Sequence, residues 1–178
     1  MNCDFNCSDV IIKKHFQKSI VKKDTIQLIL ISEALPQDIK DYFDGEGEPV
    51  FIKNTNSIFN LFGYNFKTYK DYLDNGIYLT TAIKCVKKDY LVCADTIKNC
   101  SAVLEKELGQ FKNKRVIMLM GDFAIKAMNY IWKKKYNEKA IPAGSTYKIR
   151  NGVYESNGIR FFPSYRKPET VLAWKNQK

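Results

Sequence analysis

The sequence predicts one α/β domain with three layers, in which helices cover both faces of a central four-stranded parallel sheet. The chain has 178 residues, the length of one ordinary domain, and its hydrophobic fraction of 45% and charged fraction of 27% are those of a globular protein. Short apolar runs of β-type residues alternate with segments of helical periodicity, and such strands pair in parallel through right-handed crossovers. No linker, repeat or low-complexity stretch divides the chain, so we expect a single domain over residues 1–178.

Four apolar runs are the expected strands. The runs QLILIS and RVIMLM are continuous, as in strands that are covered on both faces. Helices are expected between the strands, and in the longest of them Ile97, Leu104 and Leu108 fall on one stripe. Asn157 and Gly158 are a turn signal that favours a hairpin before the last strand. The expected strands are 27–32, 77–83, 115–120 and 159–162, and the expected helical segments are 36–43, 56–62, 66–73, 94–111, 123–135 and a terminal helix from Pro168.

The charge of the chain favours a polyanionic partner. Lys and Arg total 29 against 19 Asp and Glu, a formal charge of +10, and cations that neutralise phosphates release counterions. The alternative is a lysine-rich surface without a directed patch. No apolar run reaches the roughly 18 residues that span a bilayer, and the first residues lack the apolar core of a signal peptide, so we expect a cytoplasmic protein without a membrane partner.

The segments that follow the four strands are the expected functional region, because open parallel sheets bind ligands beyond the carboxyl ends of their strands. These segments are 32–36 (SEALP), 80–85 (TTAIKC), 116–124 (VIMLMGDFA) and 161–165 (FFPSY). In order, and with their spacing, they resemble the motifs of the uracil-DNA glycosylase superfamily, specifically its iron–sulfur, thermostable branch. The family patterns are Gly-Glu-Ala-Pro-Gly, Thr-Asn-x-Val-Lys-Cys, an apolar run into Leu-Gly, and Phe-His-Pro-Ser-Tyr.

The resemblance implies three catalytic positions. Glu33 matches the acid that orients or activates water, although an exposed loop carboxylate or a charge at a helix N-terminus is the alternative. Thr81 stands where the family has the Asn that reads the base edge, and it offers one hydroxyl in place of a planar amide. Ser164 is expected to supply a further hydrogen bond.

The resemblance also implies base-binding and DNA-binding positions. Phe51 resembles the aromatic residue that stacks on the base, with a core residue as the alternative, and Ala34 and Phe162 are expected beside the base. Phe162 stands where the family has a His, and a phenyl ring cannot donate a hydrogen bond. The residues that match the loop pushed into the duplex are Tyr165, Arg166 and Lys167; the alternative is an ordinary turn.

The chain has five cysteines, which in a cytoplasmic protein favour free thiols or a metal site over disulfides. The family branch holds a four-iron cluster with two early cysteines and two after the second strand. By resemblance the ligands here are Cys3, Cys7, Cys85 and Cys100, and Cys93 has no counterpart. Four thiolates suit a 4Fe–4S cluster or a tetrahedral zinc equally, and scattered free thiols without a cofactor are the remaining alternative.

Together these observations predict a glycosylase-like monomer that acts on DNA. The first hypothesis is a base-excision hydrolase that cleaves the N-glycosidic bond of a damaged or deaminated base. The alternative is a DNA-binding relative that has lost catalysis. A domain for nucleotides or small ligands is the third, and the absence of a phosphate-cradling glycine motif counts against it.

Overall fold

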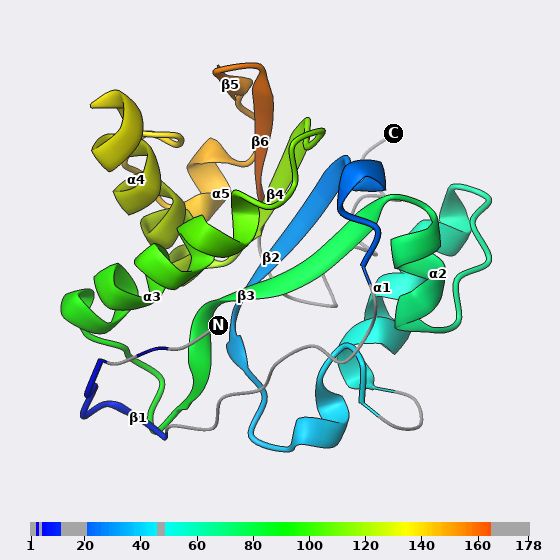
Figure 1. The fold of residues 1–178 in the computed structure, drawn as a ribbon, viewed down its shortest axis with the longest axis horizontal. Coiled ribbons are helices and arrows are strands. Elements are labelled where there is room, and N and C mark those ends of the chain that lie inside the picture. The colour runs from blue at the N-terminus through cyan, green and yellow to red at the C-terminus, as the bar shows by residue number, and fades with distance from the viewer. Residues whose placement is uncertain (1–2, 4, 12–20, 46–48, 165–178) are drawn as a thin grey trace.

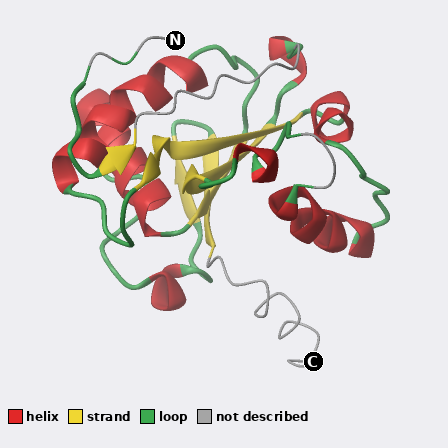
Figure 2. Cartoon of the chain, turned by 90° about the horizontal axis from the view of Figure 1, so that it is seen from below, coloured by secondary structure: helices red, strands yellow, loops and turns green. Residues whose placement is uncertain are grey.

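The structure is a computed structural model that describes residues 3, 5–11, 21–45 and 49–164. In this part of the chain a twisted sheet is flanked by helices on both faces, which confirms the predicted fold class (Figures 1 and 2). The strands are β1 (Val10–Ile11), β2 (Leu28–Leu35), β3 (Ile77–Lys87), β4 (Val116–Met120), β5 (Tyr154–Ser156) and β6 (Ile159–Ser164). The helices are α1 (Val50–Leu61), α2 (Tyr69–Asp74), α3 (Ala94–Leu108), α4 (Asp122–Tyr136) and α5 (Thr146–Ile149), with 3-10 turns η1 (Lys23–Thr25) and η2 (Ile39–Asp41).

The sheet has six strands in the order β1-β3-β2-β4-β6-β5, where the sequence predicted four. The four predicted strands are β2, β3, β4 and β6, and all of their pairings are parallel as expected. The two additional strands pair antiparallel at the edges. β1 has only two residues, and its apolar run, Val10 to Ile12, is too short to indicate a strand by itself. β5 is the first arm of the hairpin that closes at Asn157 and Gly158, both with positive φ.

The connections reverse direction at the centre of the sheet. From β2 the chain passes to α1 and α2 on one face and returns as β3, whereas β4 continues into α4, which packs with α3 on the other face (Figure 2). Pairing between β2 and β4 ends at Ile31 and Leu119, while pairing between β2 and β3 continues as far as Leu35. The carboxyl ends of β2 and β4 therefore diverge, and this is the point at which such folds bind ligands.

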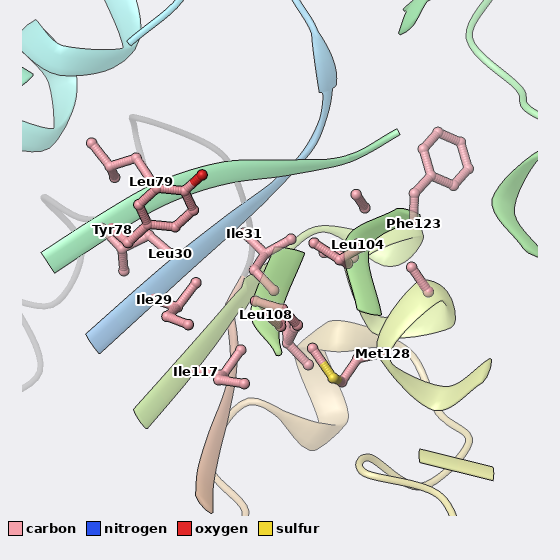
Figure 3. Packing of buried hydrophobic residues seen from close by; sticks show 14 of the residues in the cluster. Ile29, Leu30, Ile31, Tyr78, Leu79, Leu104, Leu108, Ile117, Phe123 and Met128 are labelled. Atoms are coloured by element: carbon pink, nitrogen blue, oxygen red, sulfur yellow. The ribbon is translucent and has the colours of Figure 1, made fainter. Parts of the chain in front are cut away.

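The main core lies between the sheet and the pair of helices α3 and α4. Figure 3 shows Leu104 and Leu108 of α3 and Met128 of α4 against the side chains of the central strands. Ile29 of β2 and Ile117 of β4 are fully buried. Each such side chain contributes about 1.5–3 kcal/mol relative to an exposed one, so this layer holds the carboxyl ends of the strands in register.

The region between β2 and α1 differs from the prediction. The segment 36–43 forms only the short turn η2, and α1 begins at Val50, directly after Pro49, earlier than predicted. Its buried face is formed by Phe51, Ile52 and Thr55, whereas Leu61 and Phe62, the last two residues of the predicted helical segment 56–62, are 57% and 75% exposed. The terminal helix predicted from Pro168 lies outside the described residues. Within the described residues, every helix is too short or too polar to cross a bilayer.

Candidate active site

A pocket of about 140 Å³ opens where the carboxyl ends of β2 and β3 meet α1. Four residues singled out from the sequence line it together: Glu33, Ala34, Phe51 and Thr81. They come from three elements that lie far apart in the chain, and the fold brings them to one place, as the motif order predicted. The remaining lining residues are Ser32, Leu35, Pro36, Asp41, Tyr42, Phe43 and Lys87.

Glu33 occupies the divergence point between β2 and β4. Its Oε1 lies 3.4 Å from the backbone nitrogen of Phe123, in the first turn of α4, so the carboxylate sits at the positive end of that helix. Gly121 makes this approach possible. It has φ +102°, and a Cβ atom at this position would lie only 2.5 Å from Cγ of Glu33. The carboxylate is therefore placed by the backbone of a neighbouring strand end.

Lys87 is the cationic residue of this pocket, and the sequence interpretation did not identify it. Its ammonium nitrogen lies 3.9 Å from Oε2 of Glu33 and 4.9 Å from the ring centroid of Phe123. The side chains of Lys87 and Glu33 are 25% and 28% exposed, so the pair is open to a ligand from one side. The prediction ended the second strand at residue 83, whereas β3 continues to Lys87 and carries this lysine to the pocket.

Aromatic side chains also line the pocket: Tyr42, Phe43 and Phe51. Phe51 of α1 is buried, and its ring packs edge-on against Phe43 with centroids 4.6 Å apart at 62°. Tyr42 precedes Phe43 and is also buried. Phe51 thus belongs to the core, as one of the two interpretations expected, and it also lines the pocket; its stacking on a base stays a prediction. Tyr42 and Phe43 were missed because they fall in a segment read as helical.

Thr81 lies at the bottom of the site, 1% exposed. Its hydroxyl donates to the carbonyl of Ile83 at 2.9 Å, and its oxygen remains an acceptor. A planar amide at this position would offer a hydrogen-bond donor and an acceptor to the same base edge. In this rotamer the Thr81 hydroxyl can only accept a hydrogen bond from a base, because its hydrogen is donated to Ile83. Thr81 can therefore make fewer kinds of hydrogen bond to a base than the Asn of the family pattern.

Ser164 and Phe162 lie on β6, at the level of the β4 end. The Ser164 carbonyl accepts a hydrogen bond from Gly121 N–H at 3.1 Å, which ties β6 to the backbone that supports Glu33. Phe161 packs against Trp132 of α4, so Phe162 points to the opposite face, the one that carries α1. Phe162 is 40% exposed beneath the guanidinium of Arg160, and neither it nor Ser164 is among the residues that line the pocket. The predicted DNA-binding residues Tyr165, Arg166 and Lys167 lie outside the described residues.

Comparison with known proteins gives one family. A family model described as the uracil DNA glycosylase superfamily matches residues 23–178. The chain belongs to this superfamily. A search of curated proteins finds no relative that matches. The family match spans β2 to β6 and so includes every residue that lines the pocket, whereas Cys3 and Cys7 lie before its first residue.

The N-terminal segment of this superfamily member packs beside β3 and α3. The carboxylate of Asp9 accepts hydrogen bonds from the N–H of Cys93 and the hydroxyl of Thr96, both at 2.6 Å. Burial acts to raise the pKa of Asp9, and these hydrogen bonds outweigh it and lower the pKa below its ordinary value. Asp9 thus caps the start of α3 from a distant part of the chain. The same docking pairs β1 with the end of β3.

This docking brings together the four cysteines that the resemblance named. Cys85 and Cys100 are buried, and Cys3 and Cys7 are half-buried. Burial raises the pKa of Cys100 to about 11, and electrostatic repulsion from Cys85, Cys3 and Cys7 contributes to the shift, so Cys100 lies within electrostatic range of each of the other three. Cys93 is exposed and stands apart from this set.

The four cysteines have the donor type of a metal site, because thiolates ligate both iron–sulfur clusters and zinc ions. A tetrahedral zinc with Zn–S bonds of about 2.3 Å requires sulfur atoms within roughly 4 Å of one another. Among the residues that the structure describes, no three His, Cys, Asp or Glu side chains are grouped closely enough to hold one metal ion.

Proposed function

We propose that the chain is a DNA glycosylase that hydrolyses the bond between deoxyribose and a damaged or deaminated base. Enzymes of this class extrude the target nucleotide from the duplex and enclose its base. The observation that carries the proposal is the meeting of Glu33 with aromatic side chains in one pocket of about 140 Å³. An engineered cavity of about 150 Å³ binds benzene, so this pocket suits a single six-membered ring.

Each side of the pocket has a separate role in the proposed reaction. The rings of Phe51 and Phe43 contact the base, and Ala34, next to Glu33, leaves space for it. Thr81 accepts a hydrogen bond from the base edge. Ser164 and Phe162 on β6 do not line the pocket, and their proposed role is contact with the extruded nucleotide outside it. The proposed contacts to the duplex backbone are Tyr165, Arg166 and Lys167.

Glu33 is the proposed general base. Its carboxylate orients a water molecule toward C1′ of the sugar and balances the positive charge that develops on the ring. As the C1′–N bond breaks, its electron pair leaves with the base. The water oxygen bonds to C1′ and its proton passes to Glu33. The first turn of α4 and Lys87 orient the carboxylate through long contacts, Phe123 N–H to Oε1 at 3.4 Å and the Lys87 ammonium to Oε2 at 3.9 Å, which leave it able to accept from a water molecule.

The experiment measures abasic sites in duplexes that contain uracil, hypoxanthine or xanthine. Glu33→Gln should lower the release rate by about 100- to 10,000-fold with unchanged affinity for DNA, as expected for loss of a general base. The matched control is Glu155→Gln, an exposed acid on β5, which should leave release unchanged. Release at the wild-type rate by Glu33→Gln, or the absence of release from all three duplexes by the wild-type protein, would overturn the proposal.

A second candidate function is a DNA-binding relative without hydrolysis. It is favoured by Thr81, whose hydroxyl hydrogen is committed to its own strand, and by Phe162, which cannot donate to a departing base. The charge of +10 supports DNA binding in either case. Binding that weakens steeply with salt, with no abasic sites from any substrate, would identify this function.

For the cysteines we propose a 4Fe–4S cluster held by Cys3, Cys7, Cys85 and Cys100. Such a cluster would tie the N-terminal segment to β3 and α3 and take no part in hydrolysis. Anaerobically purified protein should be brown with broad visible absorbance, and Cys85→Ser should lose the colour and the iron. Cys93→Ser is the matched control and should keep both. A colourless protein that contains zinc, or neither metal, would contradict the cluster.

A further inference from the structure

The pocket contains a cation whose donors are incompletely used. Among the described residues that line the pocket, Lys87 alone carries a positive charge. Its ammonium group lies 3.5 Å from the Tyr90 carbonyl and 3.9 Å from Glu33, both longer than the 2.7–2.9 Å typical of charge-assisted hydrogen bonds. An ammonium has three donors, so Lys87 retains capacity for a ligand.

The position of Lys87 is set by the fold. β3 ends at this residue, and Val10 of β1 pairs with it from the other side. The ammonium also lies over the ring of Phe123, in the first turn of α4, which holds the side chain toward the pocket. Lys87 and Glu33 therefore line the same pocket, and Lys87 is positioned there by a strand of the sheet.

The proposed hydrolysis needs such a group. When the C1′–N bond breaks, the departing base takes the electron pair and becomes an anion, and donors aimed at that charge lower the barrier. The His of the family motif is replaced by Phe162, which has no donor and lies away from the pocket lining. Without another donor the charge on the base would have to be borne by solvent alone.

We infer that Lys87 stabilises the departing base as an anion, by donating from its ammonium group to an acceptor on the ring edge. This inference rests on the proposed glycosylase function. The lysine remains protonated throughout, and the base leaves either as the anion or after taking a proton from solvent. Glu33 handles the water and Lys87 handles the leaving group, so the pair divides the two charges of the transition state.

The first test measures the affinity of the intact protein for two free rings at neutral pH. Barbiturate is a pyrimidine ring that is anionic at this pH, and uracil is a neutral ring of similar size. The wild-type protein should prefer barbiturate, and Lys87→Met should reduce that preference about tenfold, while Lys87→Arg retains most of it. Lys88→Met is the matched control, because Lys88 is exposed, bonds to the Ser8 carbonyl and does not line the pocket.

The second test uses the leaving group itself. On uracil duplexes Lys87→Met should lower kcat by about 100-fold, the effect of removing one transition-state donor, with little change in KM. With 5-fluorouracil, which is a better leaving group, the defect should shrink to a few-fold. An equal defect on both substrates would mean that Lys87 acts only by positioning Glu33, and would overturn the inference.

The two tests separate the inference from the function on which it rests. If the wild-type protein releases no base, the glycosylase proposal fails, and the free-ring experiment still decides whether Lys87 creates an anion site. A preference for barbiturate that survives in Lys87→Met, or no binding of either ring by the wild-type protein, contradicts the inference.

Discussion

Two lysines of β3, Lys84 and Lys87, each form an ion pair with a glutamate. The two pairs differ in how many of the glutamate oxygens have a close hydrogen-bond donor. Lys84 lies 2.5 Å from Glu107 of α3, whose other oxygen accepts from the hydroxyls of Tyr78 at 2.7 Å and Thr80 at 2.9 Å. Lys87 lies 3.9 Å from Glu33. The side chains of the first pair are 19% and 12% exposed, and those of the second pair 25% and 28%.

The comparison shows that burial alone does not distinguish an ion pair whose hydrogen-bonding groups are all used from one that lies open in a pocket. Every oxygen of Glu107 has a close donor, and helix α3 covers the group, so nothing is left for a ligand. Burial and the nearby Glu107 charge raise the pKa of Tyr78 far above its ordinary value, so its hydroxyl stays protonated and keeps donating. With the described residues, Glu33 makes two polar contacts, both long, to the Lys87 ammonium and to Phe123 N–H, and it lines a pocket.

The largest loss of stability is expected from breaking the Lys84–Glu107 pair, in which both carboxylate oxygens have close donors. Glu107→Ala should lower the free energy of unfolding by about 3 kcal/mol, because it leaves the ammonium of Lys84 buried without its counter-charge. The hydroxyls of Tyr78 and Thr80 lose their acceptor at the same time. Urea unfolding, followed by the tryptophan signal, measures the loss.

A control for this change lies on the same helix. Glu105 bonds to Lys134 and Lys135, whose side chains are 70% and 41% exposed. Glu105→Ala should therefore cost about 0–1 kcal/mol, as surface ion pairs do. Equal losses in the two variants would show that the network around Glu107 is no stronger than a surface pair, and the contrast drawn above would be wrong.

The sequence predicted the parallel part of the fold because its signals are local. The continuous apolar run QLILIS indicates a buried strand, and the apolar stripe of α3 indicates a helix with one buried face. β1 was not found in this way, since its β-branched run is too short to indicate a strand without the partner β3 that pairs with it. The start of α1 was also misplaced, because burial of Phe51 and Ile52 depends on the rings that pack over them.

The candidate site was only partly predictable for the same reason. Glu33, Ala34, Phe51 and Thr81 were located by their motifs, and the fold gathers them into one pocket. Lys87 belongs to no motif in the chain and reaches the pocket only because β3 continues beyond its apolar run. The importance of Gly121 likewise depends on a side chain from another strand, so no pattern in its own segment reveals it.

A smaller effect on stability, with a larger effect on function, is expected at Gly121. Alanine at Gly121 or at Gly158 should cost about 1–2 kcal/mol of stability, because both have positive φ. A Cβ at Gly158 meets nothing within 4 Å, whereas at Gly121 it displaces the side chain of Glu33. The flexible glutamate can move aside cheaply, so the added cost should appear in catalysis, as a fall of about tenfold or more in the rate of base release. If Gly121→Ala and Gly158→Ala release base at the same rate, the position of Glu33 does not matter for catalysis. The Lys87–Glu33 pair would then be no more functional than the Lys84–Glu107 pair.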